Sequence, residues 1–327
     1  MCWPGSSRPF AAAPDPVPRY AADFETMLAA GETLVIDGGL ATQCEAQGCD
    51  ISTPLWSAAL LHSNPGAIIA AHRAYLDAGA DIIISASYQA SREGFAREGI
   101  GAAEADALIA GSLRLAAEAR DAFLGDNPGT DRRPLVAASV GPYGATLHDG
   151  SEYGGDYGVS SSALRDFHAT RLGVLDGDPA DLLACETIPS FTEAAVLAGL
   201  LRSATLPAWV SFSCRDAMHI SDGTPIAEVA ALFSGHPRVL AIGVNCTPPR
   251  FIMPLIMAIR AAAPDRAIVV YPNSGERYAA ADNSWSGSRS SFDWAAAASE
   301  WRDAGAALIG GCCRVGPAEI AAIARSL

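Results

Sequence analysis

Short apolar runs rich in valine, isoleucine and leucine recur eight times along the chain, and they constrain its fold more than any other feature. The runs are LVID (34–37), DIIIS (81–85), LVAASV (135–140), DLLACE (181–186), AWVSFS (208–213), LAIGVN (240–245), AIVVYP (267–272) and ALIGG (307–311). Their length and composition are typical of buried strands. We therefore expect eight strands that pair in a buried, parallel sheet.

Alanine-rich segments with helical spacing lie between most of these runs. They cover residues 65–77, 102–123, 161–175, 192–203 and 292–304. Eight strand-helix units favour an α/β fold of the (β/α)8 TIM-barrel type. A doubly wound sheet usually has fewer strands and a glycine-rich phosphate turn, and the chain has no GxGxxG motif. The polar stretch 273–291, after the seventh run, is a long loop that could carry a lid over the barrel.

The N-terminal segment has a different composition from the rest of the chain. Its first 18 residues, MCWPGSSRPFAAAPDPVP, contain five prolines and no apolar core of signal-peptide length. We expect residues 1–20 to be a disordered tail and residues 21–327 to form the barrel. No apolar stretch approaches the roughly 20 residues that span a bilayer. We therefore expect no contact with membranes and a cytoplasmic protein whose cysteines stay reduced.

The charged residues exclude several classes of function. The chain has 22 basic and 36 acidic side chains and a formal net charge of −14, so its field repels phosphate backbones and nucleic acid is not an expected partner. Every basic residue is arginine. Schiff-base chemistry, lysine-anchored pyridoxal phosphate and a P-loop lysine are therefore excluded.

Cysteines gather where a barrel would place its active site. Residues just past each strand of such a barrel line one common mouth. Cys246 follows the sixth run, and the stretch ALIGGCCRV (307–315) places Cys312 and Cys313 after the eighth. Catalytic zinc sites use three protein ligands and leave one position open, so these three cysteines predict a zinc site with a vacancy. Thiolates favour zinc over magnesium or calcium, and Gly310-Gly311 allows the sharp turn that adjacent ligands need.

The alternative for any cysteine beside alanines is a place in the apolar core, which we prefer for Cys185, inside the fourth run. Three thiolates around Zn²⁺ form a net negative site that activates water poorly. Such a site can hold a fourth thiolate and lower its pKa below about 8.5. No HExxH motif or Ser/His/Asp arrangement is evident. Alkylation of a substrate thiol is therefore the most economical reaction.

Eight motifs in this order resemble one enzyme family across nearly the whole chain. They are DGGLATQCEAQG (37–48), LWSAALLHSNP (55–65), SASYQAS (85–91), SVGPYGA (139–145), ACETIPSFTEA (184–194), GVNCTPP (243–249), YPNSGERY (271–278) and GGCCR (310–314). Together they resemble the homocysteine S-methyltransferases. The resemblance implies a zinc-dependent (β/α)8 barrel that methylates the zinc-bound thiolate of L-homocysteine, which yields methionine.

The resemblance also implies roles for single residues. The cysteines of GVNC and GGCC bind zinc in the family, which carries over to Cys246, Cys312 and Cys313. The glutamate of ET and the aspartate of DGG hold the homocysteine amino group, which carries over to Glu186 and Asp37.

By the same matching, Trp56 and Tyr88 pack near the amino acid, and amides around Gly38 face its carboxylate. Each residue type also has a structural interpretation. A glutamate can favour a helix dipole, an aspartate before glycines can be a turn residue, and the aromatic residues can be core.

The methyl donor separates subgroups of the family. The motifs SYQA, NCTPP and YPNSGE resemble the stand-alone enzymes that use S-methylmethionine and sometimes S-adenosylmethionine. No cobalamin-binding segment follows the barrel, which disfavours cobalamin-dependent methionine synthase. A betaine-type enzyme stays open because both donors are onium cations that aromatic faces accommodate. The loop after the third run offers a donor subsite, with Tyr143, Glu152, Tyr153, Asp156 and Tyr157.

Two further alternatives stay open at this point. A methyltransferase for another small thiol or selenol would have the same zinc site. A non-catalytic zinc-storing or thiol-sensing barrel would also use the three cysteines. The sequence does not settle the oligomeric state.

Overall fold

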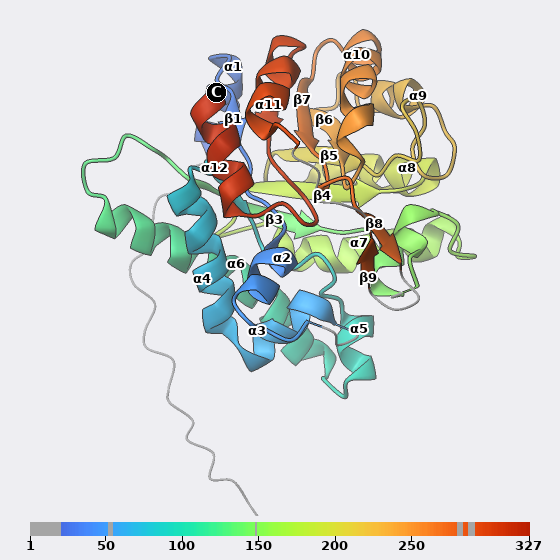
Figure 1. The fold of residues 1–327 in the computed structure, drawn as a ribbon. Helices are drawn as coiled ribbons and strands as arrows, with labels where there is room; N and C mark the ends of the chain where they lie inside the picture. The colour runs from blue at the N-terminus through green and yellow to red at the C-terminus, as the bar shows by residue number, and fades with distance from the viewer. Residues whose placement is uncertain (1–20, 52–54, 148, 280–283, 287–291) are drawn as a thin grey trace, which may run out of the picture.

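The computed structural model describes residues 21–51, 55–147, 149–279, 284–286 and 292–327, and it shows a parallel barrel with helices outside (Figure 1). The strands are β1 (Leu34–Val35), β2 (Ile82–Ile84), β3 (Leu135–Val140), β4 (Leu182–Ile188), β5 (Ala208–Phe212), β6 (Val239–Asn245), β7 (Ala267–Tyr271) and β10 (Ala306–Ile309). Each coincides with one of the eight apolar runs. The predicted (β/α)8 barrel is confirmed.

Both faces of the barrel wall are buried, which explains why the runs are apolar throughout. In β3, Leu135 and Ala137 belong to the core inside the barrel, whereas Val136 and Ala138 pack with the surrounding helices. This alternation follows from the strand geometry, in which successive side chains point to opposite faces. Phe24, from helix α1 (Ala21–Ala29), joins the inner core. Figure 1 shows α1 at the end of the molecule away from β8 and β9.

The barrel closes between its first two strands by a short seam. The sheet order is β1-β10-β7-β6-β5-β4-β3-β2, so β1 and β2 are its ends. One parallel bridge, between Ile36 and Ile82, joins them. Next to it the Asp37 N–H donates to the Ile82 carbonyl over 2.9 Å, and the Ile84 N–H donates to Asp37 Oδ2 over 2.8 Å. A side-chain carboxylate therefore continues the ladder where the backbone pairing ends.

The five predicted periodic segments are helical, and the structure adds further helices. The long ones are α4 (Pro65–Ala78), α6 (Ala102–Asp126), α7 (Ser161–Leu175), α8 (Phe191–Leu200), α10 (Ile252–Ala262), α11 (Trp294–Asp303) and α12 (Pro317–Ser326). Shorter ones are α2 (Leu40–Ala46), α3 (Leu60–Ser63), α5 (Arg92–Arg97) and α9 (Ile226–Ala231). Ser160 and Ser190 cap α7 and α8 by accepting backbone N–H groups of the first turn. The predicted helix at 192–203 ends in a 3₁₀ turn, η4 (Leu201–Ser203).

The loop after β7 has more structure than a plain polar loop. It contains β8 (Arg277–Ala279), which pairs antiparallel with β9 (Ser284–Ser286). Residues 280–283 and 287–291 lie outside the described residues, as does the tail predicted at 1–20. In the described parts of the chain, no helix combines the length and apolar character needed to cross a lipid bilayer.

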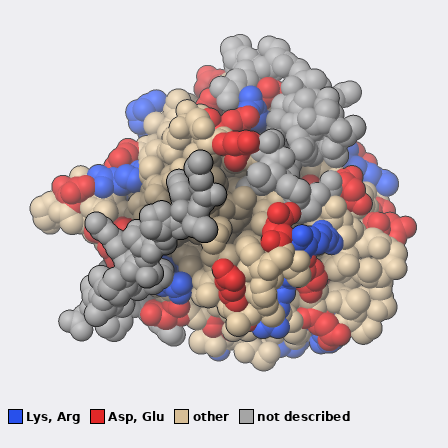
Figure 2. All heavy atoms as spheres, turned by 90° about the horizontal axis from the view of Figure 1, so that it is seen from below, with Lys and Arg blue, Asp and Glu red and all other residues tan. Residues whose placement is uncertain are grey.

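The end of the molecule that carries β8 and β9 shows mixed charge. In Figure 2, acidic and basic side chains are interspersed around a central hollow of uncharged atoms.

Candidate active site

A cavity opens among the carboxyl ends of the strands, where a barrel of this type holds its active site. It encloses about 890 Å³ including its open mouth. Its wall includes the predicted residues Gly38, Tyr88, Glu186, Cys246, Cys312 and Cys313. No arginine, lysine or histidine is among the described residues that line it.

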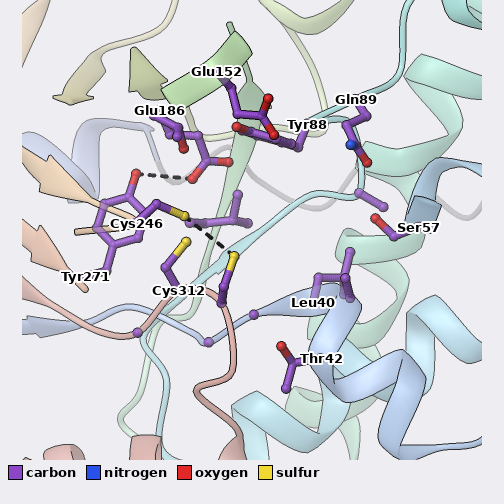
Figure 3. Close-up of a pocket in the computed structure, with 18 of the residues that line it drawn as sticks. Leu40, Thr42, Ser57, Tyr88, Gln89, Glu152, Glu186, Cys246, Tyr271 and Cys312 are labelled. Atoms are coloured by element: carbon purple, nitrogen blue, oxygen red, sulfur yellow. Dashed lines mark hydrogen bonds between the residues drawn. The ribbon is translucent and has the colours of Figure 1, made fainter. Parts of the chain in front are cut away.

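The three predicted cysteine ligands meet in this cavity (Figure 3). The Sγ atoms of Cys246, Cys312 and Cys313 all lie within 4.8 Å of one another, and those of Cys246 and Cys313 are 3.6 Å apart. Zn–S bonds of about 2.3 Å in a tetrahedron place two sulfurs about 3.8 Å apart. The observed spacing therefore fits one zinc-sized ion held by three thiolates.

The backbone at the cysteines is sharply bent. Cys246 leaves β6 with φ 45°, a left-handed conformation that costs non-glycine residues free energy. At Gly311 a Cβ atom would lie 2.1 Å from a methyl carbon of Val315, so only glycine fits before the cysteine pair. The Cys312 N–H then donates to the Pro272 carbonyl over 2.8 Å. These constraints turn two adjacent thiols toward the same cavity.

Burial and mutual contact disfavour ionisation of the thiols when no cation is present. Contact with Cys312 lowers the pKa of Cys246, but contact with Cys313, burial and the nearby Glu186 carboxylate outweigh it. The pKa of the Cys246 thiol is therefore held well above its usual range. A divalent cation at this point would reverse that balance because a coordinated thiol is deprotonated.

Glu186 projects from β4 into the cavity and is held by two donors. Its Oε1 accepts from Ser139 Oγ over 2.5 Å, and its Oε2 accepts from the Tyr271 hydroxyl over 3.2 Å. Trp209 Nε1 donates to the same tyrosine oxygen over 3.1 Å. Burial raises the pKa of Glu186 to about 7, although the hydrogen bonds from Ser139 and Tyr271 lower it. A bound cation would favour its charged form further.

The same network continues to the cysteine cluster through Asn245. Its Oδ1 accepts from the Thr187 N–H over 2.7 Å and from Ser211 Oγ over 2.9 Å. Its Nδ2 donates to Thr187 Oγ1 over 2.7 Å and reaches Cys312 Sγ at 3.9 Å. Asn245 is fully buried, so these contacts orient the strand ends on which Glu186 and Cys246 lie.

Tyr88 is positioned from behind by a buried cation. Arg171, from α7, donates to the backbone carbonyls of Ser87, Tyr88 and Gly141 at 2.7, 3.0 and 2.6 Å. Burial lowers the pKa of Arg171 to about 10. These hydrogen bonds join the loops after β2 and β3 beneath the cavity wall.

The loop between β3 and α7 divides its predicted donor residues into two groups. Glu152 and Tyr153 line the cavity, on the 3₁₀ turn η3 (Ser151–Tyr153). The Tyr143 N–H and the Tyr157 hydroxyl instead donate to Glu193, and Asp156 is exposed. Only part of the predicted donor subsite therefore faces the cavity.

Comparison with known proteins places the chain in a family. A model of the family "Homocysteine S-methyltransferase" matches residues 34–327. The chain belongs to the homocysteine S-methyltransferase family. Homocysteine S-methyltransferase 4 of Zea mays is 50% identical over 309 residues, which cover 91% of this chain and 90% of that protein. Homocysteine S-methyltransferase YbgG of Bacillus subtilis is 47% identical over 300 residues, 90% of this chain and 95% of that protein.

A solved structure from this family has the same fold. The metallated form of the homocysteine methyltransferase MmuM from Escherichia coli superimposes with a TM-score of 0.83 at 43% sequence identity. The match covers 93% of this chain and 99% of that chain.

One residue that the family resemblance singles out, Asp37, is not among the described residues that line the cavity. Asp37 is buried in the barrel seam, where Oδ1 has no hydrogen-bond partner among the described residues and burial raises its pKa well above its usual range. Trp56 begins the 3₁₀ turn η1 (Trp56–Ala59), and its side chain lies outside the described part of the structure. Their roles stay predictions.

The motif analysis gave no role to several polar residues of this homocysteine S-methyltransferase site. Ser139, Ser211 and Tyr271 support Glu186 and Asn245, directly or through one another. Each is the last or second-last residue of a buried strand. A polar side chain near the carboxyl end of an otherwise apolar strand is the signal that could have identified them.

Proposed function

We propose that this protein transfers a methyl group from a sulfonium donor to the thiol of L-homocysteine, which yields methionine. The observation that carries the proposal is the convergence of three cysteine thiols and two carboxylates on one cavity. The sulfonium donor is S-methylmethionine, with S-adenosylmethionine as a second substrate. We place the reaction in the cytoplasm, where cysteines remain reduced.

Cys246, Cys312 and Cys313 are the residues that would hold a zinc ion. Their sulfur spacing and their soft donor atoms support zinc over the hard divalent cations. Zinc bound there would lower the pKa of the homocysteine thiol, so that the thiolate is available as nucleophile at neutral pH.

Glu186 would orient homocysteine by accepting hydrogen bonds from its ammonium group. Ser139 and Tyr271 each use one hydrogen bond to hold the carboxylate, and each carboxylate oxygen keeps capacity for another donor. The carboxylate therefore enters the reaction with its direction already set. Asp37 Oδ1 is a second buried acceptor for the same ammonium group.

The reaction itself needs no general base from the chain. The bond between the donor sulfur and its methyl group breaks as the bond from the homocysteine sulfur forms, and the electron pair stays on the donor sulfur. A cation and an anion are both neutralised. A cavity that excludes water favours this step because the two charges meet without solvent reorganisation.

The charges of the cavity support an onium donor over an anionic one. Glu152 and Glu186 line it, and no described basic side chain does. Betaine is also an onium cation and is the second donor class to test. A different small thiol or selenol as methyl acceptor would use the same three cysteines.

A donor panel tests the proposal. Purified protein with zinc and ¹³C-labelled homocysteine is supplied with S-methylmethionine, S-adenosylmethionine or betaine, and labelled methionine is measured by mass spectrometry. We expect the fastest turnover with S-methylmethionine. A zinc-loaded protein that forms no labelled methionine from any donor would contradict the proposal and favour a zinc-storing or thiol-sensing barrel.

A further inference from the structure

Glu152 carries a buried carboxylate oxygen that the described residues leave unpaired. The side chain is 9% exposed and lines the cavity, and its Oε2 has no hydrogen-bond partner among the residues that the structure describes. Figure 3 shows it next to Tyr88, at the end of the cavity away from Thr42. An unpaired buried acceptor of this kind costs free energy unless a ligand supplies its partner.

Burial, helped by the nearby Asp149 carboxylate, raises the pKa of Glu152 to about 7, although a hydrogen bond from its own backbone amide lowers it. The partner that would favour the charged form is a cation. No described residue that lines the cavity can supply one, because none is arginine, lysine or histidine. A positive charge beside Glu152 would therefore come from a ligand in the cavity and not from a described side chain of its wall.

The backbone around Glu152 is held in place independently of any ligand. The fully buried Glu193 of α8 accepts from the Tyr143 N–H over 2.7 Å, from the Tyr157 hydroxyl over 2.8 Å, and lies 2.8 Å from His168 Nε2. Ser213 Oγ donates to the Glu152 carbonyl over 3.2 Å. The loop between β3 and α7 is thus fastened on both sides of the 3₁₀ turn.

On the basis of the proposed function, we propose that Glu152 binds the positively charged sulfonium group of the methyl donor, with Tyr88 and Tyr153 as its aromatic neighbours. Both tyrosines line the cavity with Glu152. A carboxylate and aromatic faces are the groups that attract an onium cation, which has no N–H or O–H to donate. Glu186 lies on β4 and is left for the homocysteine ammonium group.

This assignment predicts a specific kinetic effect. The positive charge on the donor sulfur is present in the bound substrate and disappears as the methyl group leaves. Attraction to Glu152 is therefore stronger before the transition state than in it. Loss of the Glu152 charge should weaken donor binding without slowing the chemical step, so it should raise the donor KM and leave kcat nearly unchanged.

The decisive experiment compares Glu152→Gln with Asp156→Asn in the zinc-loaded protein. Asp156 is an exposed carboxylate on the same loop, so it is a matched control. For Glu152→Gln we expect the KM for S-methylmethionine to rise about tenfold or more, as for loss of a charged contact. The homocysteine KM, kcat and zinc content should each stay within about twofold. Asp156→Asn should leave all four unchanged. An unchanged donor KM, or equal rises in both KM values, would overturn the assignment.

Direct binding separates this assignment from the proposed function. Calorimetry with S-methylmethionine on the zinc-loaded wild type and Glu152→Gln, without homocysteine, involves no turnover because no methyl acceptor is present. About tenfold weaker binding to the variant supports the assignment even if no donor is turned over, and equal binding overturns it. Inhibition by dimethylsulfoniopropionate, which has a sulfonium but no ammonium group, should weaken by the same factor. Unchanged inhibition would place Glu152 at the donor ammonium group and overturn the proposal.

Discussion

Two buried glutamates line the same cavity, one from a strand and the other from a loop. Glu186 lies on β4, and both of its oxygens accept hydrogen bonds from side chains of other strands. Glu152 lies on a 3₁₀ turn in the loop between β3 and α7, and one of its oxygens has no partner among the described residues. Burial raises the pKa of both carboxyl groups to about 7.

The difference shows how a barrel can divide recognition between its strands and its loops. The strand-end group is oriented before any substrate arrives, through a network that runs from Trp209 to Cys312. Only the backbone around Glu152 is held in place, and its carboxylate has an oxygen without a partner among the described residues. We associate the first arrangement with the methyl acceptor and the second with the donor.

The largest loss of activity should come from removing a thiol of the cysteine cluster, which lines the same cavity as Glu152 and Glu186. Alanine at Cys246, Cys312 or Cys313 should abolish stoichiometric zinc and lower kcat/KM by about a thousandfold or more, because the nucleophile is no longer activated. The barrel should stay folded. Zinc is measured by mass spectrometry and folding by circular dichroism.

Cys185→Ala is the matched control, because Cys185 is buried on β4 and lies outside the cavity wall. It should keep its zinc. Retention of stoichiometric zinc in all three cluster variants would contradict the ligand assignment.

A smaller effect is expected on the strand side of the comparison. Glu186→Gln removes the charge that we propose for binding the homocysteine ammonium group, so the homocysteine KM should rise about ten- to a hundredfold. The KM for S-methylmethionine should change far less. Initial rates with each substrate varied in turn measure both. Equal changes in the two KM values would remove the division between acceptor and donor carboxylates.

The smallest effect is expected when the loop is loosened without touching the cavity. Glu193→Gln replaces an acceptor of three hydrogen bonds by an amide that opposes one of its donors, at a cost of about 1–3 kcal/mol. We expect Tm to fall by a few degrees, and the donor KM to rise about threefold with little change for homocysteine. Scanning fluorimetry and steady-state rates measure these changes.

The exposed Glu228, in the first turn of α9, is the control for Glu193. Glu228→Gln should change neither Tm nor the donor KM. A Glu193→Gln variant with a lower Tm but an unchanged donor KM would show that the loop does not depend on this anchor for its function.

The fold could be predicted from local patterns because each strand of the barrel is buried on both faces. The run LVAASV became β3 with all six residues buried. The meeting of the three cysteines could be predicted for a related reason, since residues after parallel strands meet at one mouth. Cys246 and Cys312 are 66 positions apart in the chain, yet their place after β6 and β10 was enough.

The supporting residues depend on contacts that no local pattern contains. Glu193 resembles an ordinary acidic residue in the first turn of α8, and its three partners lie 25 to 50 residues earlier. Glu152 and Asp156 have the same charge in the same loop, and only the backbone path turns one inward and leaves the other exposed. Asp37 follows the first strand as expected, but the sequence does not show that one of its oxygens closes the barrel.

The stability of the seam between β1 and β2 should depend on whether a ligand is bound in the cavity. A single bridge, its flanking backbone hydrogen bonds and the carboxylates of Asp37 and Asp81 hold it, so local opening should begin there, directly beneath the cavity. A bound amino acid that donates a hydrogen bond to Asp37 Oδ1 would stabilise this seam. Hydrogen exchange at the Ile84 amide should then slow when homocysteine is present. The exchange rate at this seam would therefore report ligand binding.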